Sequence, residues 1–132
     1  MLYIVRGIPG SGKSTYAKTL GCPVFEADMF FIKDGKYNWN PRLLGSAHNW
    51  CKQNVSKLLS KGKDVAVANT FIKLKHIQEY IDLAKKYDEP YQVIKIVGDH
   101  KNVHSVPDET VKKMKANWED FNGEKTVNTN KK

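Results

Sequence analysis

One stretch near the N-terminus decides the fold: Gly7-Ile8-Pro9-Gly10-Ser11-Gly12-Lys13-Ser14, followed by Thr15. It matches the phosphate-binding loop pattern G-x-x-x-x-G-K-[ST] at every fixed position. Its glycines let the backbone turn sharply and approach a phosphate closely, so that successive backbone N–H groups point inward. The helix that we expect to begin near Lys13 adds the positive end of its dipole. The stretch therefore predicts a binding site for a nucleoside triphosphate.

The motif also assigns roles to single residues. We expect the Lys13 ammonium to reach the β- and γ-phosphates, which makes Lys13 a candidate catalytic residue, and the Ser14 hydroxyl to ligate Mg²⁺. We expect the phosphates to be bound by Gly7, Pro9, Gly10, Ser11, Gly12, Lys13, Ser14 and Thr15. The context supports the motif, because residues 2–5 form a short apolar run rich in β-formers and residues 16–20 are typical of a helix that ends at Gly21.

Length and composition indicate the class of protein. The chain has 132 residues, of which 40% are hydrophobic and 27% charged, as in an ordinary globular domain. No apolar run is long enough to span a bilayer and no basic-then-apolar leader is present, so we expect no membrane partner and a cytoplasmic location. Cys22 and Cys51 follow no metal-ligand spacing, which favours reduced thiols. The net charge of +8 favours an anionic partner such as a nucleotide or a nucleic acid, although solvated lysine faces also contribute to it.

Strand-like and helix-like segments alternate along the chain. We expect strands at residues 24–27, 65–68 and 91–97, and helices at residues 41–61, 73–86 and from Pro107 onward. The alternation predicts an α/β protein with the P-loop NTPase fold: a short, mostly parallel sheet of four to five strands with helices on both faces. We expect one domain over residues 1–121. Residues 122–132 are polar and lack periodicity, which predicts a disordered C-terminal tail.

Polar residues follow the predicted strands at the edge where α/β sheets bind ligands. Asp28 is the candidate catalytic carboxylate, because there it can accept the proton of an attacking hydroxyl or hold a water on Mg²⁺; capping a turn is the alternative. Asn69 and Thr70 end the strand at 65–68, where P-loop proteins usually place an acid. We expect these two residues to bind substrate, with capping of the next helix as the alternative.

Phosphoryl transfer needs cations over the γ-phosphate, commonly arginines. The loop after the last predicted strand offers Lys101 as a candidate catalytic cation, together with His100 and His104, and a solvated polar loop is the alternative. The chain contains only the arginines Arg6 and Arg42, which excludes an arginine-based lid.

An aromatic concentration after Asp28 is interleaved with basic residues. It comprises Phe30, Phe31, Tyr37, Trp39 and Trp50, with Lys33, Lys36 and Arg42 between them. Such a mixture can stack on bases and hold a phosphate backbone, so Arg42 is a candidate substrate-binding residue. Packing of the aromatic rings in the core is the alternative.

The order of these motifs resembles that of small P-loop kinases of the polynucleotide 5′-hydroxyl kinase-like family, which includes many phage ATPases. The matching pieces are residues 7–15, 26–31, 37–41, 68–70 and 102–107. The resemblance implies ATP as the donor and transfer of its γ-phosphate to a 5′-hydroxyl of a nucleic acid. It further implies that Asp28 acts as general base, that Lys13 binds ATP and that Ser14 supports Mg²⁺. For a phage-encoded chain the location would be the host cytoplasm.

The sequence departs from that family at three places. Asp28-Met29 stands where an Asp-Asp pair is usual, the strand that ends at Asn69 has no Asp, and His100 and Lys101 replace the arginines of a lid that is shortened here. ATP binding survives all three departures. Three alternatives stay open: a regulatory nucleotide-binding protein with little turnover, a kinase of a small metabolite, and a nucleic-acid-binding ATPase.

Overall fold

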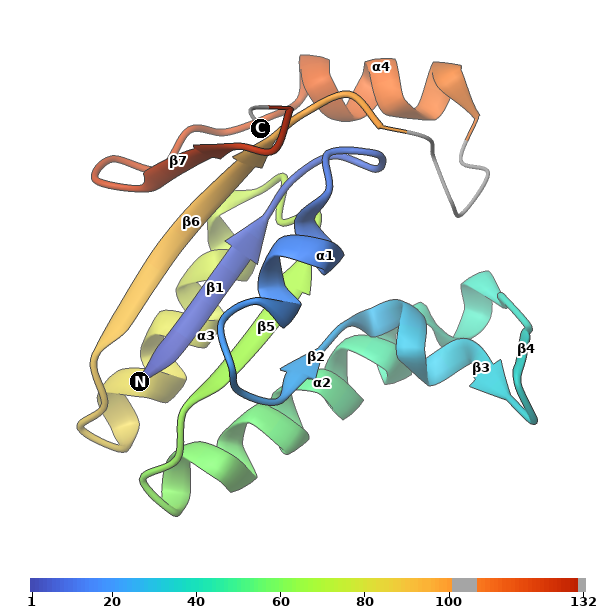
Figure 1. Cartoon of the computed structure of the whole chain (residues 1–132). Helices are drawn as coiled ribbons and strands as arrows, with labels where there is room; N and C mark the ends of the chain where they lie inside the picture. Colours follow the sequence, from blue (N-terminus) through green and yellow to red (C-terminus); the bar gives the residue numbers. More distant parts are fainter. Residues whose placement is uncertain (101–106, 131–132) are drawn as a thin grey trace.

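The computed structural model describes residues 1–100 and 107–130, and its centre is a parallel sheet. The strands are β1 (Leu2–Arg6), β2 (Val24–Phe25), β5 (Val65–Asn69), β6 (Tyr91–Val97) and β7 (Lys125–Asn128). They follow the spatial order β2-β5-β1-β6-β7, and each neighbouring pair is parallel. All the carboxyl ends therefore lie at one edge of the sheet (Figure 1). The predicted α/β fold with a mostly parallel sheet is confirmed.

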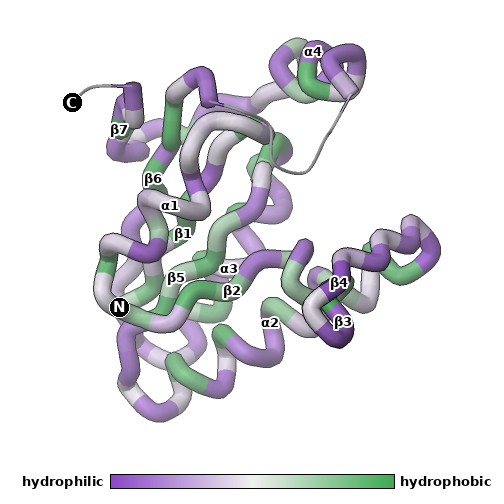
Figure 2. Tube along the Cα trace, turned by 45° about the vertical axis from the view of Figure 1, so that its right-hand side comes forward, coloured by the Kyte–Doolittle hydropathy of each residue, from purple (hydrophilic) through white to green (hydrophobic). Residues whose placement is uncertain are grey.

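Helices cover both faces of this sheet, as the alternation predicts. Alternate residues of a strand face opposite sides, and in β1 Leu2 and Ile4 pack in the core cluster formed with α2 (Leu44–Ser60) and α3 (Leu74–Lys86). Val5 faces the other way and packs in the cluster that contains Ala17 of α1 (Lys13–Lys18). Figure 2 shows hydrophobic residues along the central strands β1, β5 and β6.

The segment between β2 and α2 is built from short elements. It contains the 3-10 helix η1 (Ala27–Phe31), a hairpin of β3 (Ile32–Lys33) and β4 (Lys36–Tyr37), and the 3-10 helix η2 (Pro41–Leu43). Positive φ angles of 53° and 76° at Asp34 and Gly35 form the tight hairpin turn. The hairpin projects away from the sheet, whereas α4 (Asp108–Ala116) lies beyond the edge formed by the carboxyl ends of the sheet strands (Figure 1). Within the described residues, no helix is both long and apolar enough to cross a bilayer.

The prediction of a disordered tail over residues 122–132 needs correction for the part that the structure describes. Lys125–Asn128 form β7, which pairs with β6 so that Lys125 lies opposite Ile94 and Asn128 opposite Val97. The strand escapes notice in the sequence because it lies at the sheet edge and three of its four side chains are exposed. An edge strand of this kind needs little apolar character.

Arg6 explains how the C-terminal segment is held on the sheet. Its side chain is fully buried, and Nη1 donates to Glu124 Oε1 at 3.1 Å while Nη2 donates to the Glu119 carbonyl at 2.7 Å. Nε and Nη2 also donate to the Phe71 carbonyl at 3.1 and 2.6 Å, and the guanidinium lies 4.0 Å from the centre of the Trp118 ring. Arg6 therefore joins β1, the segment after β5 and the C-terminal segment.

Candidate active site

The phosphate loop connects β1 to α1 at the carboxyl edge of the sheet. Gly10 and Gly12 have φ angles of 84° and 91°, a region that favours glycine, and α1 begins at Lys13 directly after them. A Cβ on Gly12 would lie 2.9 Å from Thr129 Oγ1. The predicted phosphate-binding residues form one continuous segment of loop and first helical turn: Gly7, Pro9, Gly10, Ser11, Gly12, Lys13, Ser14 and Thr15.

Ser11 supplies a test of whether this loop fits phosphate groups. The side chain is fully buried, and within residues 1–100 and 107–130 its Oγ has no hydrogen-bonding partner. Buried hydroxyls are almost always paired. An orphaned hydroxyl in a glycine loop at the start of a helix fits a phosphate oxygen as the missing partner. The residues present therefore fit the phosphates of a nucleotide.

Ser14 has a carboxylate partner that the sequence did not reveal. Its Oγ donates to Glu26 Oε1 at 2.5 Å, and Glu26 lies between β2 and η1. Mg²⁺ in nucleotide sites is held by one or two protein oxygens together with phosphates and waters, so this pair fits the predicted metal. The only signal available in the sequence was the position of Glu26, directly after the strand that also leads to Asp28.

The charges of Glu26 and Asp28 act on the Lys13 ammonium. Burial lowers the pKa of the Lys13 ammonium, while the charges of Glu26 and Asp28 raise it. An opposite charge acts in this way only at short range. The structure therefore brings Lys13, Ser14, Glu26 and Asp28 together, at the ends of two strands.

Asp28 is oriented by two neighbouring segments. The Ala27 N–H donates to Asn69 Oδ1 at 2.9 Å, which ties η1 to the end of β5. Tyr37 Oη donates to Asp28 Oδ1 at 3.0 Å. Desolvation and the charge of Asp28 raise the pKa of Tyr37 to about 12, so its hydroxyl stays a hydrogen-bond donor at neutral pH. Asn69 thus positions the backbone beside Asp28.

The C-terminal turn at Thr129 contacts the phosphate loop. Thr129 Oγ1 donates to the Ser11 carbonyl at 2.6 Å, and His100 Nε2 is 2.7 Å from the same hydroxyl. The His100 N–H also donates to the Gly10 carbonyl at 2.8 Å. His100 is therefore beside the phosphate loop. Lys101 and His104 lie outside the described residues.

Other predicted residues are divided between the core and the surface. Phe31 belongs to the main core cluster, and Phe30 and Trp50 pack against it, so core packing holds for these rings. Tyr37 and Trp39, by contrast, are 45% and 55% exposed. Arg42 is exposed in η2, where its backbone N–H donates to Asn40 Oδ1 at 3.0 Å.

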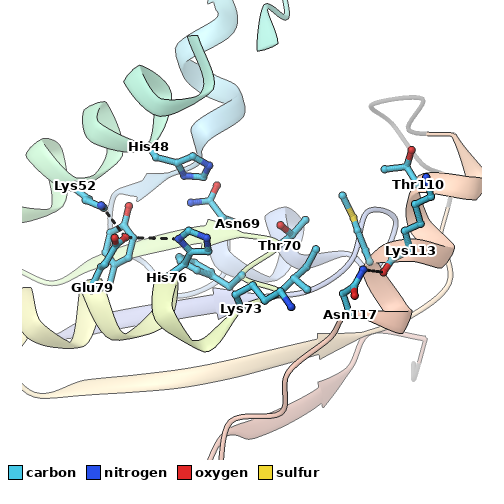
Figure 3. A pocket seen from close by; sticks show the side chains of 14 residues that line it. His48, Lys52, Asn69, Thr70, Lys73, His76, Glu79, Thr110, Lys113 and Asn117 are labelled. Carbon is cyan, nitrogen blue, oxygen red and sulfur yellow. Dashed lines mark hydrogen bonds and ion pairs between the residues drawn. The ribbon is translucent and has the colours of Figure 1, made fainter. Parts of the chain in front are cut away.

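A pocket of about 520 Å³ opens beside Asn69 and Thr70, at the end of β5 (Figure 3). Its walls come from α2, α3 and α4, which contribute His48, His76 and Lys113 among others. The predicted substrate-binding residues Asn69 and Thr70 therefore line a cavity of the size that small ligands occupy.

Comparisons with known proteins agree with this architecture. The model of a family named AAA_33 and described as an AAA domain matches residues 2–120. Human NEDD4-binding protein 2 is 26% identical over 138 aligned positions, which cover 92% of this chain and 8% of that protein. The chain thus spans only 8% of the length of this curated relative.

Solved structures share the fold at low sequence identity. Kti12 from Chaetomium thermophilum, in complex with ADP-AlF3, has a TM-score of 0.71 at 14% identity, covering 100% of this chain and 91% of that chain. A gluconokinase from Sinorhizobium meliloti 1021 has a TM-score of 0.59 at 18% identity, with coverages of 95% and 79%. A chain of the Pnkp1/Rnl/Hen1 RNA repair complex has a TM-score of 0.60 at 22% identity, with coverages of 86% and 35%. The chain therefore shares the α/β fold of these P-loop proteins.

Proposed function

We propose that this chain, which belongs to the AAA_33 family of AAA domains, is an ATP-dependent phosphotransferase. The observation that carries the proposal is the convergence of Lys13, the Ser14–Glu26 pair and Asp28 at one edge of the sheet. A cation, a metal-binding oxygen pair and a separate carboxylate are the parts that phosphoryl transfer requires.

Each residue has a distinct task in this reaction. The phosphate loop and Lys13 bind and neutralise the triphosphate, and Ser11 Oγ gains the partner that it lacks within the described residues. Ser14 and Glu26 would hold Mg²⁺ or its waters, and bound Mg²⁺ supplies positive charge against the phosphate oxygens. Asp28 accepts the proton of the acceptor hydroxyl while the oxygen of that hydroxyl bonds to the γ-phosphorus. The bond from that phosphorus to the bridging oxygen of ADP breaks.

A nucleic-acid 5′-hydroxyl is the acceptor that we propose, as in polynucleotide 5′-hydroxyl kinase-like enzymes. The net charge of +8 favours a polyanion. Tyr37 and Trp39 are exposed beside the exposed Lys33 and Lys36, a combination that suits stacking on bases and attraction of phosphates. One chain of similar fold belongs to an RNA repair complex. Lys101 remains the proposed cation over the transferred phosphate.

A small metabolite is the second candidate acceptor. The pocket beside Asn69 has a volume of about 520 Å³, which suits a small molecule. A gluconokinase of the same fold is consistent with such chemistry. A regulatory protein with little turnover is favoured by the lack of a carboxylate where β5 ends, at Asn69, and by the lack of arginines other than Arg6 and Arg42.

The test is a transfer assay with γ-labelled ATP, Mg²⁺ and 5′-hydroxyl DNA or RNA oligonucleotides. A 5′-phosphorylated oligonucleotide of the same sequence serves as the control. We expect label on the 5′-hydroxyl strand only, with a rate lowered about 10²- to 10⁴-fold by Asp28→Asn and by Lys13→Ala. Asp28→Asn should keep its affinity for ATP.

Other results would point away from this reaction. Binding of ATP without label on any oligonucleotide would exclude the polynucleotide kinase, and if no small hydroxyl compound is labelled either, it would favour the regulatory protein. Label on a small hydroxyl compound alone would replace the nucleic acid with a metabolite. Release of free phosphate, stimulated by nucleic acid and without a labelled strand, would indicate an ATPase.

A further inference from the structure

The pocket beside Asn69 is connected by a hydrogen bond to the segment that carries the proposed general base. Asn69 lines the pocket and, through Oδ1, accepts the hydrogen bond of the Ala27 N–H at 2.9 Å, one residue before Asp28. The charge of Asp28 is also among the influences on the pKa of His48, which lines the same pocket. An acceptor bound in this pocket would therefore lie near the segment that carries Asp28.

The charges around the pocket favour an anion. Lys52, Lys73 and Lys113 line it, whereas Glu79 is the only acid among its described lining residues. Lys52 Nζ neutralises Glu79 at 2.8 Å, as Figure 3 shows. Lys73 is 4.0 Å from Glu119, with both side chains nearly half exposed, so that pair is weak. None of the ion pairs found among residues 1–100 and 107–130 includes Lys113. Lys73 and Lys113 remain available for a ligand.

The floor of the pocket has the features of a ligand site. Tyr80 is 2% exposed, and its hydroxyl has no hydrogen-bonding partner within the described part of the chain. Phe71, whose ring packs edge-on against Tyr80 with centroids 5.4 Å apart, has a φ angle of 48°. Strained backbone and unpaired buried polar groups are uncommon and gather at functional sites.

One wall of the pocket offers the flat surfaces of two histidine rings. The rings of His48 on α2 and His76 on α3 are nearly parallel, with an interplanar angle of 10° and centroids 6.4 Å apart. Burial lowers the pKa of His48, and the neighbouring His76 and Lys52 act in the same direction. The flat ring of His48 can stack against a sugar or a base of a ligand.

We propose that this pocket binds a phosphate group carried by the phosphoryl acceptor, with Lys73 and Lys113 as its counter-charges. The inference rests on the proposed phosphotransferase function and specifies its substrate class: a hydroxylated acceptor that already bears a phosphate. That phosphate belongs either to the terminal nucleotide of a nucleic-acid strand or to a free phosphorylated metabolite. In both cases the phosphate lies at the lysines and the reacting hydroxyl lies at Asp28.

The first test measures binding to the full chain by calorimetry without ATP. The probes are adenosine and adenosine 3′-monophosphate, which differ only by the phosphate. We expect the phosphorylated probe to bind more tightly, and Lys73→Ala and Lys113→Ala each to weaken it about tenfold. Lys75→Ala and Lys112→Ala are matched controls, because each removes the same charge from the same part of the chain outside the pocket. Lys113→Arg should restore much of the affinity.

Two further probes separate the sources of the phosphate. Tight binding of a 5′-hydroxyl oligonucleotide, lost in the Lys73 and Lys113 variants, supports a nucleic-acid strand. Binding of ribose 5-phosphate but not of the oligonucleotide supports a metabolite. Equal affinities for adenosine and adenosine 3′-monophosphate, or equal losses in the control variants, would overturn the pocket assignment.

The transfer assay distinguishes failure of this inference from failure of the proposed function. Transfer with an acceptor KM that Lys73→Ala and Lys113→Ala leave unchanged would overturn the pocket assignment and keep the kinase. Loss of phosphate-probe binding in those variants, without transfer to any acceptor, would overturn the kinase and keep an anion site.

Discussion

The phosphate loop and the pocket beside Asn69 lie at the same edge of the sheet but are built differently. The loop is one continuous segment, and its shape follows from glycines with positive φ and the start of α1 at Lys13. The pocket takes its walls from α2, α3, α4 and the end of β5. The comparison teaches that local backbone chemistry is enough to shape the phosphate loop, whereas the walls of the pocket depend on contacts between distant segments.

Both sites are held by the C-terminal segment, though unequally. On the loop side Thr129 Oγ1 donates to the Ser11 carbonyl at 2.6 Å. On the pocket side the buried guanidinium of Arg6 donates to Phe71, Glu119 and Glu124. A buried charge with several partners is costly to disturb, so the pocket should be the more sensitive region.

The largest effect should come from Arg6→Ala. This change leaves Glu124 and the carbonyls of Phe71 and Glu119 without their buried donor, and we expect a loss of about 3–5 kcal/mol in the free energy of unfolding. Urea denaturation measures it. Arg42→Ala is the matched control, because Arg42 is exposed and should change stability by less than about 0.5 kcal/mol. A loss below about 1 kcal/mol in Arg6→Ala would contradict the role given to this residue.

Gly12→Ala should have an intermediate effect confined to the loop. The φ angle of 91° and the 2.9 Å approach of the new Cβ to Thr129 Oγ1 predict a loss of about 1–3 kcal/mol and weaker ATP binding. Gly21→Ala is the control, because Gly21 also has a positive φ, 73°, but a Cβ there would meet no atom of the described residues within 4 Å. If both variants bind ATP equally well, the close packing at Gly12 does not matter for the nucleotide.

Tyr37→Phe should have the smallest effect. It removes the 3.0 Å hydrogen bond to Asp28, which is worth about 1 kcal/mol, or roughly a fivefold lower kcat. The pKa of Tyr37 is raised to about 12, so the hydroxyl keeps its proton, and hence its hydrogen bond, at all pH values well below 12. The ratio of wild-type to variant rates should therefore be constant from pH 6 to pH 9, with Tyr91→Phe as an exposed control. A ratio that changes with pH would argue against a simple hydrogen-bonding role.

Much of the fold was readable in the sequence, but the candidate site was readable only in part. The loop motif, the alternation of strands and helices, and the placing of Asp28 and Asn69 at strand ends all follow from nearby residues. Glu26 was not identified as the partner of Ser14, because nothing in the local sequence shows which side chain the Ser14 hydroxyl meets. The sequence did not predict β7 because this strand is short and polar. For the same reason it did not predict the contact of Thr129 with the phosphate loop.

The sequence by itself determined the glycine loop and the α/β architecture, because glycine conformation and hydrophobic periodicity act over a few residues. Tertiary structure alone decided that Arg6 is buried against Glu124, 118 positions away, and that Thr129 lies on the phosphate loop. It also decided which helices enclose the pocket at Asn69. The physical reason is the same in each case: a buried polar group takes its partners from whichever segments the packed sheet brings beside it.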